Sequence, residues 1–282
     1  MRSETKFLKE QILNVNSLTE KIKILRNSYI CDECYIISAG PSFKEIDPVV
    51  LYDKLKDKLV ISVKQTYNVL NDITDFHLLN PYNYQPYVYS KNEPIICYTE
   101  IDGLNYKLPF LKYDLKFTIP LDKANKENSL SILRNFDDYL IEKSHQRPFG
   151  PGIMHELGIY LPLLLGIKKV YVIGWDLGSI KSNKIERFYS KKNGNFITNY
   201  FIENKPSLYN KYFVPLINKY NYFLFLLGNN SVLNNPGISD NEASFIAEST
   251  WDLYKWYQEK NIDLFVISNT SMLDTRIPRT QI

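Results

Sequence analysis

Cysteine is scarce in this sequence of 282 residues, which contains only Cys31, Cys34 and Cys97. Cys31 and Cys34 have the spacing of a metal-binding pair, but a structural zinc site takes four ligands and the sequence has no second pair. We therefore expect reduced thiols, as in a cytoplasmic protein.

Long hydrophobic runs are also missing. The most apolar stretch, LGIYLPLLLGIKKVYVIGW (157–175), is interrupted by Pro162, Gly166 and a pair of lysines, so it is not a membrane span. The first residues, MRSETKFLKEQIL, are polar and amphipathic, unlike a signal peptide. We expect a cytoplasmic protein whose contact with the inner membrane surface, if it has one, is peripheral.

The sequence has no large excess of one charge. Its net charge is +3, and basic and acidic residues are interspersed. A basic stripe of the kind that binds nucleic acid is therefore not expected. The chain also has neither a Walker loop nor a G-x-G-x-x-G fingerprint.

Short apolar runs are present, and they alternate with stretches of helical periodicity. The runs are rich in β-branched residues and nearly continuous in hydrophobicity, as buried parallel strands are. This alternation predicts an α/β fold with a doubly wound, mostly parallel, Rossmann-like sheet. The predicted strands are 35–40, 58–63, 76–80, 94–99, 169–176 and 263–269, and the predicted helices are 44–56, 129–143, 152–165, 206–226 and 243–260.

Two segments stand apart from this alternation. Apolar residues at helical spacing in 6–27 predict N-terminal cover helices within residues 1–30, which leaves 31–282 as one α/β domain. Residues 178–206 are polar and basic, follow a strand end directly and have no periodicity. A long irregular stretch of this kind indicates a lid or an insert.

A tight strand-to-helix turn lies near the start of the predicted domain, in the stretch CYIISAGPSFKEID (34–47). We expect Gly40 to adopt a φ that other residues resist, and Pro41 to preset the turn. Ser42 would cap the following helix, whose free N–H groups form an anion site suited to a phosphate. A purely structural turn with a serine cap is the alternative.

A second constellation lies in SHQRPFGPGIMHELG (144–158). Arg147 precedes a helix start built from Gly150, Pro151 and Gly152, where small residues would let a ligand approach the backbone. An arginine beside a helix N-terminus suits a phosphate or a carboxylate. His155 has either a packing role or a functional one, and no second histidine completes a metalloprotease motif.

Taken in order, these stretches resemble the bacterial sialyltransferases that add sialic acid to lipooligosaccharide, and the wider group of motility-accessory-factor and MptE-like proteins. The resemblance covers roughly residues 34–278. It is carried by the turn at 36–47, SVKQTY (62–67), NPYNY (80–84), Arg147 with its glycine-rich helix start, LGIKKVYVIGWDL (165–177) and NIDLFVISNTSMLDTRIP (261–278).

The resemblance implies a nucleotide-sugar-binding fold of a GT-A-variant type, with a lid at about 178–206. It implies transfer of sialic acid, or a similar acidic sugar, from a CMP-activated donor to a cell-surface glycan, with inversion and without a metal or other cofactor. Tyr189, or less well Tyr200, would bind the leaving phosphate. The residues it places at the donor are Ser38, Gly40, Ser42, Lys64, Asn80, Arg147, Gly150, Gly152, Asp176 and Tyr189.

The sequence departs from the family pattern at several positions. Ala39 and Lys64 stand where the family has asparagines. The family's general base is a histidine in the segment that corresponds to 234–250, and here no histidine follows His155. Three carboxylates of that segment could act as the base, although acidic residues at a helix start also complement the helix dipole. They are Asp240, Glu242 and Glu248.

Two other functions are kept as alternatives. An MptE-like diphosphokinase would transfer pyrophosphate from ATP to a pterin alcohol and would need Mg²⁺ held by carboxylates, for which Asp176 is available. A nucleotide- or glycan-binding relative without activity is the other. The sequence is compatible with an oligomer. The main geometric expectation is that Gly40 and Arg147 meet at one edge of the sheet and bind the same negatively charged nucleotide.

Overall fold

The computed structural model describes residues 1–29, 31–82, 84–89, 93–120, 134–148, 152–176, 201, 205–228, 240–268, 271 and 273–282, without the side chains of 206 and 240–245. Its centre is a seven-stranded sheet in the order β5-β4-β3-β2-β1-β6-β7. The strands are β1 (Glu33–Ile37), β2 (Leu59–Val63), β3 (Phe76–Leu79), β4 (Ile95–Ile101), β5 (Leu115–Ile119), β6 (Lys169–Ile173) and β7 (Asp263–Ile267).

Every pair of neighbouring strands is parallel, so the predicted Rossmann-like α/β fold is confirmed. Successive strands from β1 to β5 add to one side of β1, whereas β6 and β7 add to the other side. The sheet therefore has a topological switch point between β1 and β6, the place where ligands of such folds commonly bind.

The strand β5 was not predicted. Its sequence, LKFTI, alternates between buried and half-buried residues, because it forms one edge of the sheet. The six predicted strands lie further inside or are more continuously apolar. The edge strand β5 lacks the continuous apolar run that indicates a fully buried strand.

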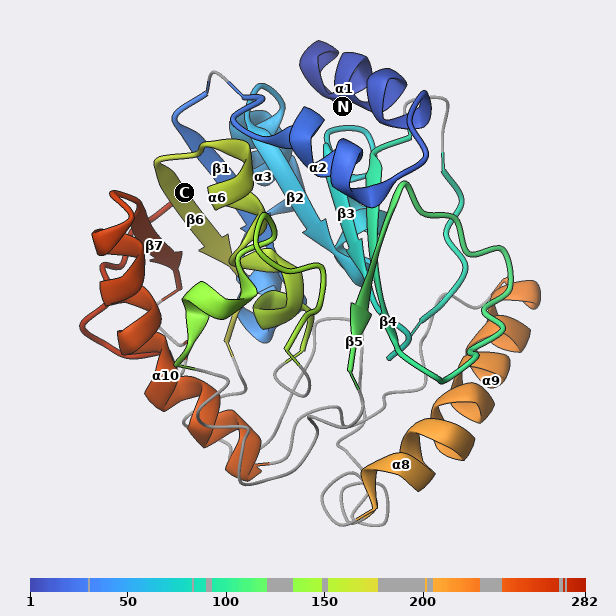
Figure 1. Ribbon diagram of the computed structural model, residues 1–282. Coiled ribbons are helices and arrows are strands. Elements are labelled where there is room, and N and C mark those ends of the chain that lie inside the picture. The colour runs from blue at the N-terminus through green and yellow to red at the C-terminus, as the bar shows by residue number, and fades with distance from the viewer. Residues whose placement is uncertain are drawn as a thin grey trace.

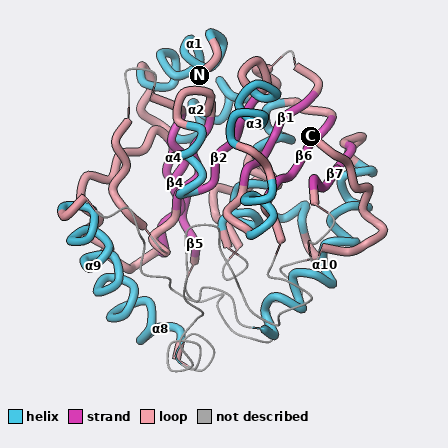
Figure 2. The backbone as a smooth tube through the Cα atoms, turned by 180° about the vertical axis from the view of Figure 1, so that it is seen from behind, coloured by secondary structure: helices cyan, strands magenta, loops and turns pink. Residues whose placement is uncertain are grey.

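The helices form a layer on each face of the sheet (Figure 1, with the opposite face in Figure 2). One apolar core lies between the sheet and the layer that includes α1, α2, α6 and α10. A smaller core lies on the opposite face, under α3 and α4. These α-helices are α1 (Ser3–Leu13), α2 (Leu18–Leu25), α3 (Pro48–Leu55), α4 (Tyr67–Leu70), α6 (Leu161–Leu165) and α10 (Asp240–Glu259).

The predicted helices 44–56 and 152–165 are each divided into two shorter elements. Residues 44–56 form a short 3₁₀ turn, η1 (Pro41–Glu45), and then α3, which begins at Pro48 because the Asp47 side chain caps it. Residues 152–165 form a π-helical turn, η5 (Met154–Gly158), and then α6, where Pro162 lies in the first turn. Gly166 ends α6 with a φ of 85°, as its position predicted.

Of the predicted helix 129–143, the described part contains only the 3₁₀ turn η4 (Phe136–Tyr139). The predicted helix 206–226 is present as α8 (Pro206–Leu208), a π-helical turn η6 (Tyr209–Phe213) and α9 (Val214–Leu226). Lys64–Thr66 form a further 3₁₀ turn, η2. The predicted lid, 178–206, lies outside the described residues apart from Phe201, Lys205 and the backbone of Pro206.

The N-terminal helices are attached to the sheet at the amino ends of its strands. Leu8 and Ile12 of α1 are buried in the larger core. The Thr5 hydroxyl donates to Asp75, just before β3, at 2.5 Å, and lies 2.6 Å from the Tyr29 hydroxyl. Among the described residues, none of the helices has the length and apolarity needed to cross a bilayer.

Candidate functional site

The strands all end at the same edge of the sheet, which faces the lower part of the molecule in Figure 1. Polar residues gather there in two places. One group lies at the switch point between β1 and β6. The other follows β2, β3, β4 and β5.

At the switch point, the segments after β1 and β6 are in direct backbone contact. The Ser38 amide donates to the Ile173 carbonyl at 2.8 Å, and the Gly40 amide donates to the Gly174 carbonyl at 2.7 Å. Gly40 has a φ of −71°, so the prediction of an unusual φ was wrong. The glycine is required by proximity instead, because a Cβ there would lie 2.4 Å from the Gly174 carbonyl oxygen.

The Ser42 turn binds a carboxylate of the same chain. The Ser42 amide and hydroxyl each donate to Asp176, at 2.7 Å. Burial raises the pKa of Asp176, and the two hydrogen bonds from Ser42 oppose that shift by stabilising the ionised form. The negative charge expected at this turn is thus supplied by the protein itself.

The prediction that Ser42 caps the following helix was wrong. The cap of α3 is Asp47, whose side chain accepts a hydrogen bond from the Val49 amide at 2.7 Å. The roles of Ser38, Gly40, Ser42 and Asp176 in donor binding stay predictions.

The second group, here called the rim cluster, consists of five polar residues contributed by five different segments. Four of them follow or belong to neighbouring strands, and the fifth comes from the π-helical turn η5. They are Lys64 after β2, Asn80 after β3, Thr99 in β4, Arg147 beside β5 and Glu156 in η5. All five are buried.

Glu156 is at the centre of the rim cluster. The Thr99 hydroxyl donates to its carboxylate at 2.6 Å, and the Asn80 amide nitrogen lies 3.2 Å from both carboxylate oxygens. Burial raises the pKa of Glu156, while Thr99, Lys64, Asn80 and Arg147 favour the ionised form. The cluster therefore holds one carboxylate and two cationic side chains close together in a buried environment.

Arg147 is held in place by its backbone and by two aromatic rings. Its amide donates to the Thr118 carbonyl of β5 at 2.7 Å. Its guanidinium carbon lies 5.2 Å from the centre of the Tyr160 ring and 5.8 Å from that of Phe117. Nη2 donates to the Ser144 carbonyl at 2.6 Å. These contacts fix the position and the plane of the guanidinium.

Two nitrogens of the Arg147 guanidinium remain available. The side chain is 0% exposed, and Nε and Nη1 have no hydrogen-bond partner among the described residues. Burial lowers the pKa of Arg147 to about 10, so the group is still charged near neutral pH. A buried guanidinium with open N–H groups is suited to a phosphate or carboxylate, because either anion would satisfy those donors.

Lys64 has a strained backbone, with a φ of 51°. Its Nζ donates to the Tyr82 carbonyl at 2.8 Å. Its own carbonyl accepts from Nε2 of His77 at 2.9 Å. Burial lowers the pKa of His77 to about 3, so this ring is neutral, and its Nδ1 accepts from the Tyr89 hydroxyl. Left-handed backbone at a non-glycine residue is concentrated at functional sites.

The other predicted site residues are distributed as follows. His155 is buried in η5, with its ring 5.4 Å from that of Trp175. Gly152 is half-buried with a φ of 78°, and a Cβ there would meet no atom within 4 Å. Gly150, Tyr189 and Tyr200 lie outside the described residues, as do the side chains of Asp240 and Glu242. Glu248 is exposed on α10, a helix that packs against β7.

Gly40 and Arg147 share one edge of the sheet, but they are not close to each other. Gly40 follows β1, whereas Arg147 lies beside β5, four strand positions away. At about 4.8 Å per strand, the separation is roughly 19 Å. The expectation that both residues bind the same nucleotide stays a prediction, and Arg147 acts on the charge of Glu156 together with Lys64 and Asn80.

Thr99 and Glu156 were not assigned to the site from the sequence. A signal for Glu156 was present, since it is a charged residue inside the apolar stretch 153–167. Charged side chains are almost never fully buried unless they have partners. Its partners Asn80 and Thr99 are 76 and 57 residues away in the chain, so the sequence did not reveal them.

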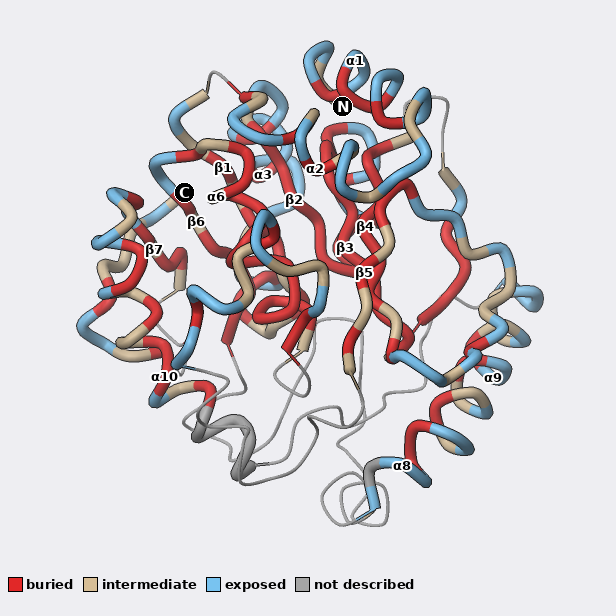
Figure 3. The backbone as a smooth tube through the Cα atoms, viewed as in Figure 1, coloured by how far each residue is buried: buried red, intermediate tan, exposed pale blue. Residues whose placement is uncertain are grey.

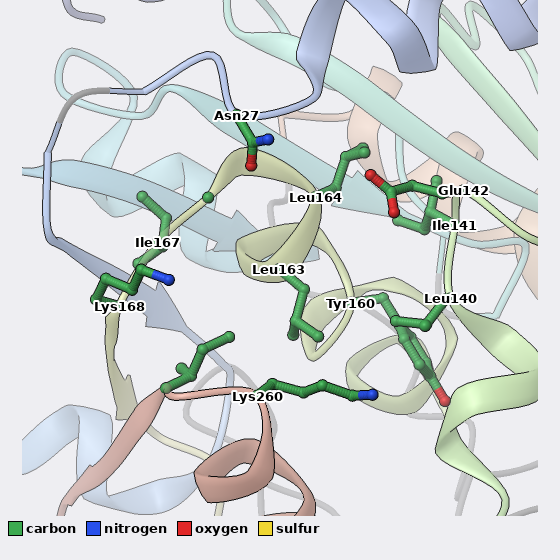
Figure 4. Close-up of a pocket in the computed structure, with 12 residues that line it drawn as sticks. Asn27, Leu140, Ile141, Glu142, Tyr160, Leu163, Leu164, Ile167, Lys168 and Lys260 are labelled. Carbon is green, nitrogen blue, oxygen red and sulfur yellow. The ribbon is translucent and has the colours of Figure 1, made fainter.

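A pocket with a volume of about 240 Å³ lies between α6, the segment 140–142 and the end of α10 (Figure 4). Lys168, which precedes β6, is among its lining residues, so it opens toward the amino ends of the strands. Tyr160 connects it to the rim cluster, because its ring also contacts Arg147. The described residues contain no group of three or more His, Cys, Asp or Glu side chains that could hold a metal ion.

In comparisons with known proteins, the sequence matches no family model and no curated protein shows significant similarity to it. The resemblance to sialyltransferases therefore depends on the motifs quoted above and on their order.

Proposed function

We propose that the protein is a metal-independent glycosyltransferase that moves sialic acid, or a similar acidic sugar, from a CMP-activated donor to a glycan acceptor. The observation that carries the proposal is Arg147, a buried and oriented guanidinium whose Nε and Nη1 are unpaired among the described residues. A CMP-activated acidic sugar offers both a phosphate and a carboxylate that such a group could bind in a bidentate way.

The chemistry requires a stabilised leaving group. The bond between the anomeric carbon and the phosphate oxygen breaks, and CMP leaves with the electron pair. The acceptor hydroxyl forms the new bond on the opposite face, and its proton passes to a base. Because the transition state has oxocarbenium character, cationic side chains near the departing phosphate lower the barrier. Arg147 and Lys64 are the residues proposed for this role.

The other members of the rim cluster would position these groups. Glu156 accepts hydrogen bonds from Asn80 and Thr99, so it would hold the Asn80 side chain in place, and its charge interacts favourably with Lys64 and Arg147. Asp240, Glu242 and Glu248 remain the proposed candidates for the general base. Tyr189 remains the proposed contact of the leaving phosphate from the lid.

Nucleotide binding by two variants tests the proposal. We expect CMP and CDP to raise the melting temperature of the unmodified protein more than AMP or GMP do. Arg147→Gln, which removes the charged fork, should weaken CMP binding about ten- to a hundredfold, because hydrogen bonds to charged groups contribute roughly 1.5–3 kcal/mol. Isothermal titration calorimetry measures the loss.

The matched control is Arg276→Gln, at an exposed arginine that is paired with Asp274. It should bind CMP like the unmodified protein. Because Arg147 is buried, Arg147→Lys is included as a second variant that keeps the charge without the planar fork. Equal stabilisation by all four nucleotides, or unchanged CMP affinity in a folded Arg147→Gln variant, would contradict the proposal.

A further inference from the structure

The helix α9 exposes its apolar side chains and buries its amides. Asn218 and Asn221 face the protein and are 3% and 1% exposed. Leu216, Phe223 and Leu226, in contrast, are 66%, 55% and 60% exposed. A surface helix normally has the opposite polarity, with its apolar stripe on the core. In Figure 3, exposed turns of α9 follow its outer side.

The inner face of this helical segment is attached by hydrogen bonds to the loop after β3. The Asn218 side chain donates to the Pro81 carbonyl at 2.8 Å, and the Asn221 side chain donates to the Tyr84 carbonyl at 3.4 Å. In η6, the Asn210 side chain accepts from the Tyr82 hydroxyl at 2.7 Å. These hydrogen bonds hold the amide side of the helical segment against the protein, so its apolar residues face outward.

The exposed apolar residues form a continuous surface. They recur at intervals of three or four residues, which places them on one side of the helical segment. Phe110, which is 70% exposed, extends this surface through its contact with Tyr222, whose ring centre is 5.8 Å away. The α9 surface is defined here as Leu208, Tyr212, Leu216, Tyr220, Phe223, Leu227 and Phe110.

The charged residues within the segment 205–228 are all positive. Exposed lysines occur at 205, 211 and 219, and residues 205–228 include no acidic residue. Lys107 and Lys112 are exposed on either side of Phe110, and Lys112 is 3.5 Å from Glu93. Aromatic side chains with flanking lysines are typical of helices that lie in a membrane interface.

We propose that the α9 surface docks on an anionic lipid bilayer. The apolar residues would enter the headgroup region, and the lysines would approach the lipid phosphates. A second copy of the chain fits this surface less well, because a symmetric contact would bring the lysines of the two copies together. The inference is independent of the proposed transferase activity, since the α9 surface contains no residue of the rim cluster.

Docking would also orient the molecule. Val214, at the start of α9, packs in one core cluster with Ile101 of β4 and Ile119 of β5. The α9 surface therefore lies next to the edge of the sheet where Arg147 pairs with β5. A docked molecule would present the carboxyl ends of β4 and β5 close to the bilayer.

Vesicle flotation with the full chain tests the proposal. We expect binding to vesicles of phosphatidylcholine and phosphatidylglycerol in equal amounts. Vesicles of phosphatidylcholine alone should bind about ten- to a hundredfold more weakly, because each lysine near an anionic surface contributes attraction that the neutral vesicles lack. Added salt should weaken the binding to the mixed vesicles.

Two variants distinguish the apolar from the charged contribution. The double variant Leu216→Asn, Phe223→Asn should bind both kinds of vesicle at least tenfold more weakly, and Lys211→Gln, Lys219→Gln should lose the preference for the anionic vesicles. The control is Phe7→Asn, which removes an exposed apolar residue of α1. It should bind as the unmodified protein does.

All of these substitutions are at exposed positions, so unfolding midpoints close to that of the unmodified protein would show that the variants fold. Three results would overturn the proposal: no binding to the mixed vesicles, equal losses in the control and the double variant, or a dimer in sedimentation that the double variant dissociates while vesicle binding is absent.

Discussion

Glu156 is a carboxylate with partners on several sides and almost no contact with solvent. Burial raises its pKa above 4.5, the value for an unperturbed glutamate, although hydrogen bonds from Thr99 and Asn80 oppose the shift. A carboxyl group whose pKa is higher in the folded state stabilises the fold fully below the unfolded pKa. That stabilisation is lost as the pH rises through the raised folded pKa.

We therefore predict a pH-dependent effect of Glu156→Gln. The free energy of unfolding of the unmodified protein, minus that of the variant, should be largest below pH 4.5 and should fall as the pH rises through the raised pKa of Glu156. Urea denaturation at a series of pH values measures it. Glu248→Gln, at an exposed position of α10, is the control. If the difference in unfolding free energy depended on pH in the same way for both variants, the raised pKa of Glu156 would be refuted.

At the scale of elements, the contact between the ends of β1 and β6 depends on two glycines. A Cβ on Gly40 would lie 2.4 Å from the Gly174 carbonyl oxygen, and one on Gly174 would lie 2.2 Å from the Ser38 carbonyl oxygen. Neither oxygen can move without separating the two strand ends. The two loops therefore approach each other more closely than any other residue type allows.

We predict that Gly40→Ala lowers the free energy of unfolding by roughly 2–3 kcal/mol, because overpacking against a backbone atom cannot be relieved by a rotamer change. Gly103→Ala is the comparison, since its φ is 74° and its Cβ would meet no atom within 4 Å. The free energy of unfolding of Gly103→Ala should fall by about 1 kcal/mol, because only the left-handed backbone is unfavourable there. If chemical denaturation gave equal losses of unfolding free energy for the two variants, the close contact at Gly40 would not be the cause of the destabilisation.

At the scale of the whole molecule, α1 shares one core with the sheet and with α10. Ile12 is 0% exposed and belongs to the same cluster as Leu253 and Trp256 of α10. A core that spans both ends of the chain predicts a single cooperative unfolding transition.

We predict that Ile12→Ala lowers the free energy of unfolding by about 2–5 kcal/mol, the usual cost of such a cavity. The loss should be visible in the fluorescence of the three tryptophans, Trp175, Trp251 and Trp256, all in the later part of the chain. Phe7→Ala, at an exposed site on α1, should change stability by less than about 0.5 kcal/mol. A tryptophan transition unaffected by Ile12→Ala would mean that α1 unfolds separately.

Much of the fold could be predicted from the sequence, because its signals are local. Buried strands are continuous apolar runs, and Gly166 ends its helix through its own φ. The edge strand β5 was missed for the same reason, since its half-buried alternation gives a weaker local signal. The π-helical turn η5 was also missed, because a helical pattern does not reveal one extra residue per turn.

The candidate site was predicted less completely. The sequence located Lys64 and Asn80 correctly at the carboxyl ends of strands, because parallel strands all end at one edge of the sheet. It predicted Arg147 at a helix start and did not reveal the strand β5 beside it. It did not determine which of these residues meet. It gave no sign that Glu156 accepts hydrogen bonds from Asn80 and Thr99.

The sequence by itself determined that this chain forms a parallel α/β sheet with polar residues at one edge, because apolar runs and turn residues act over a few neighbours. Only the tertiary structure decided that Asp176 binds Ser42 across 134 residues of chain, and that Glu156 accepts hydrogen bonds from Asn80 and Thr99. Such partnerships follow from the order of the strands, which results from packing of the whole chain and leaves no mark in local periodicity.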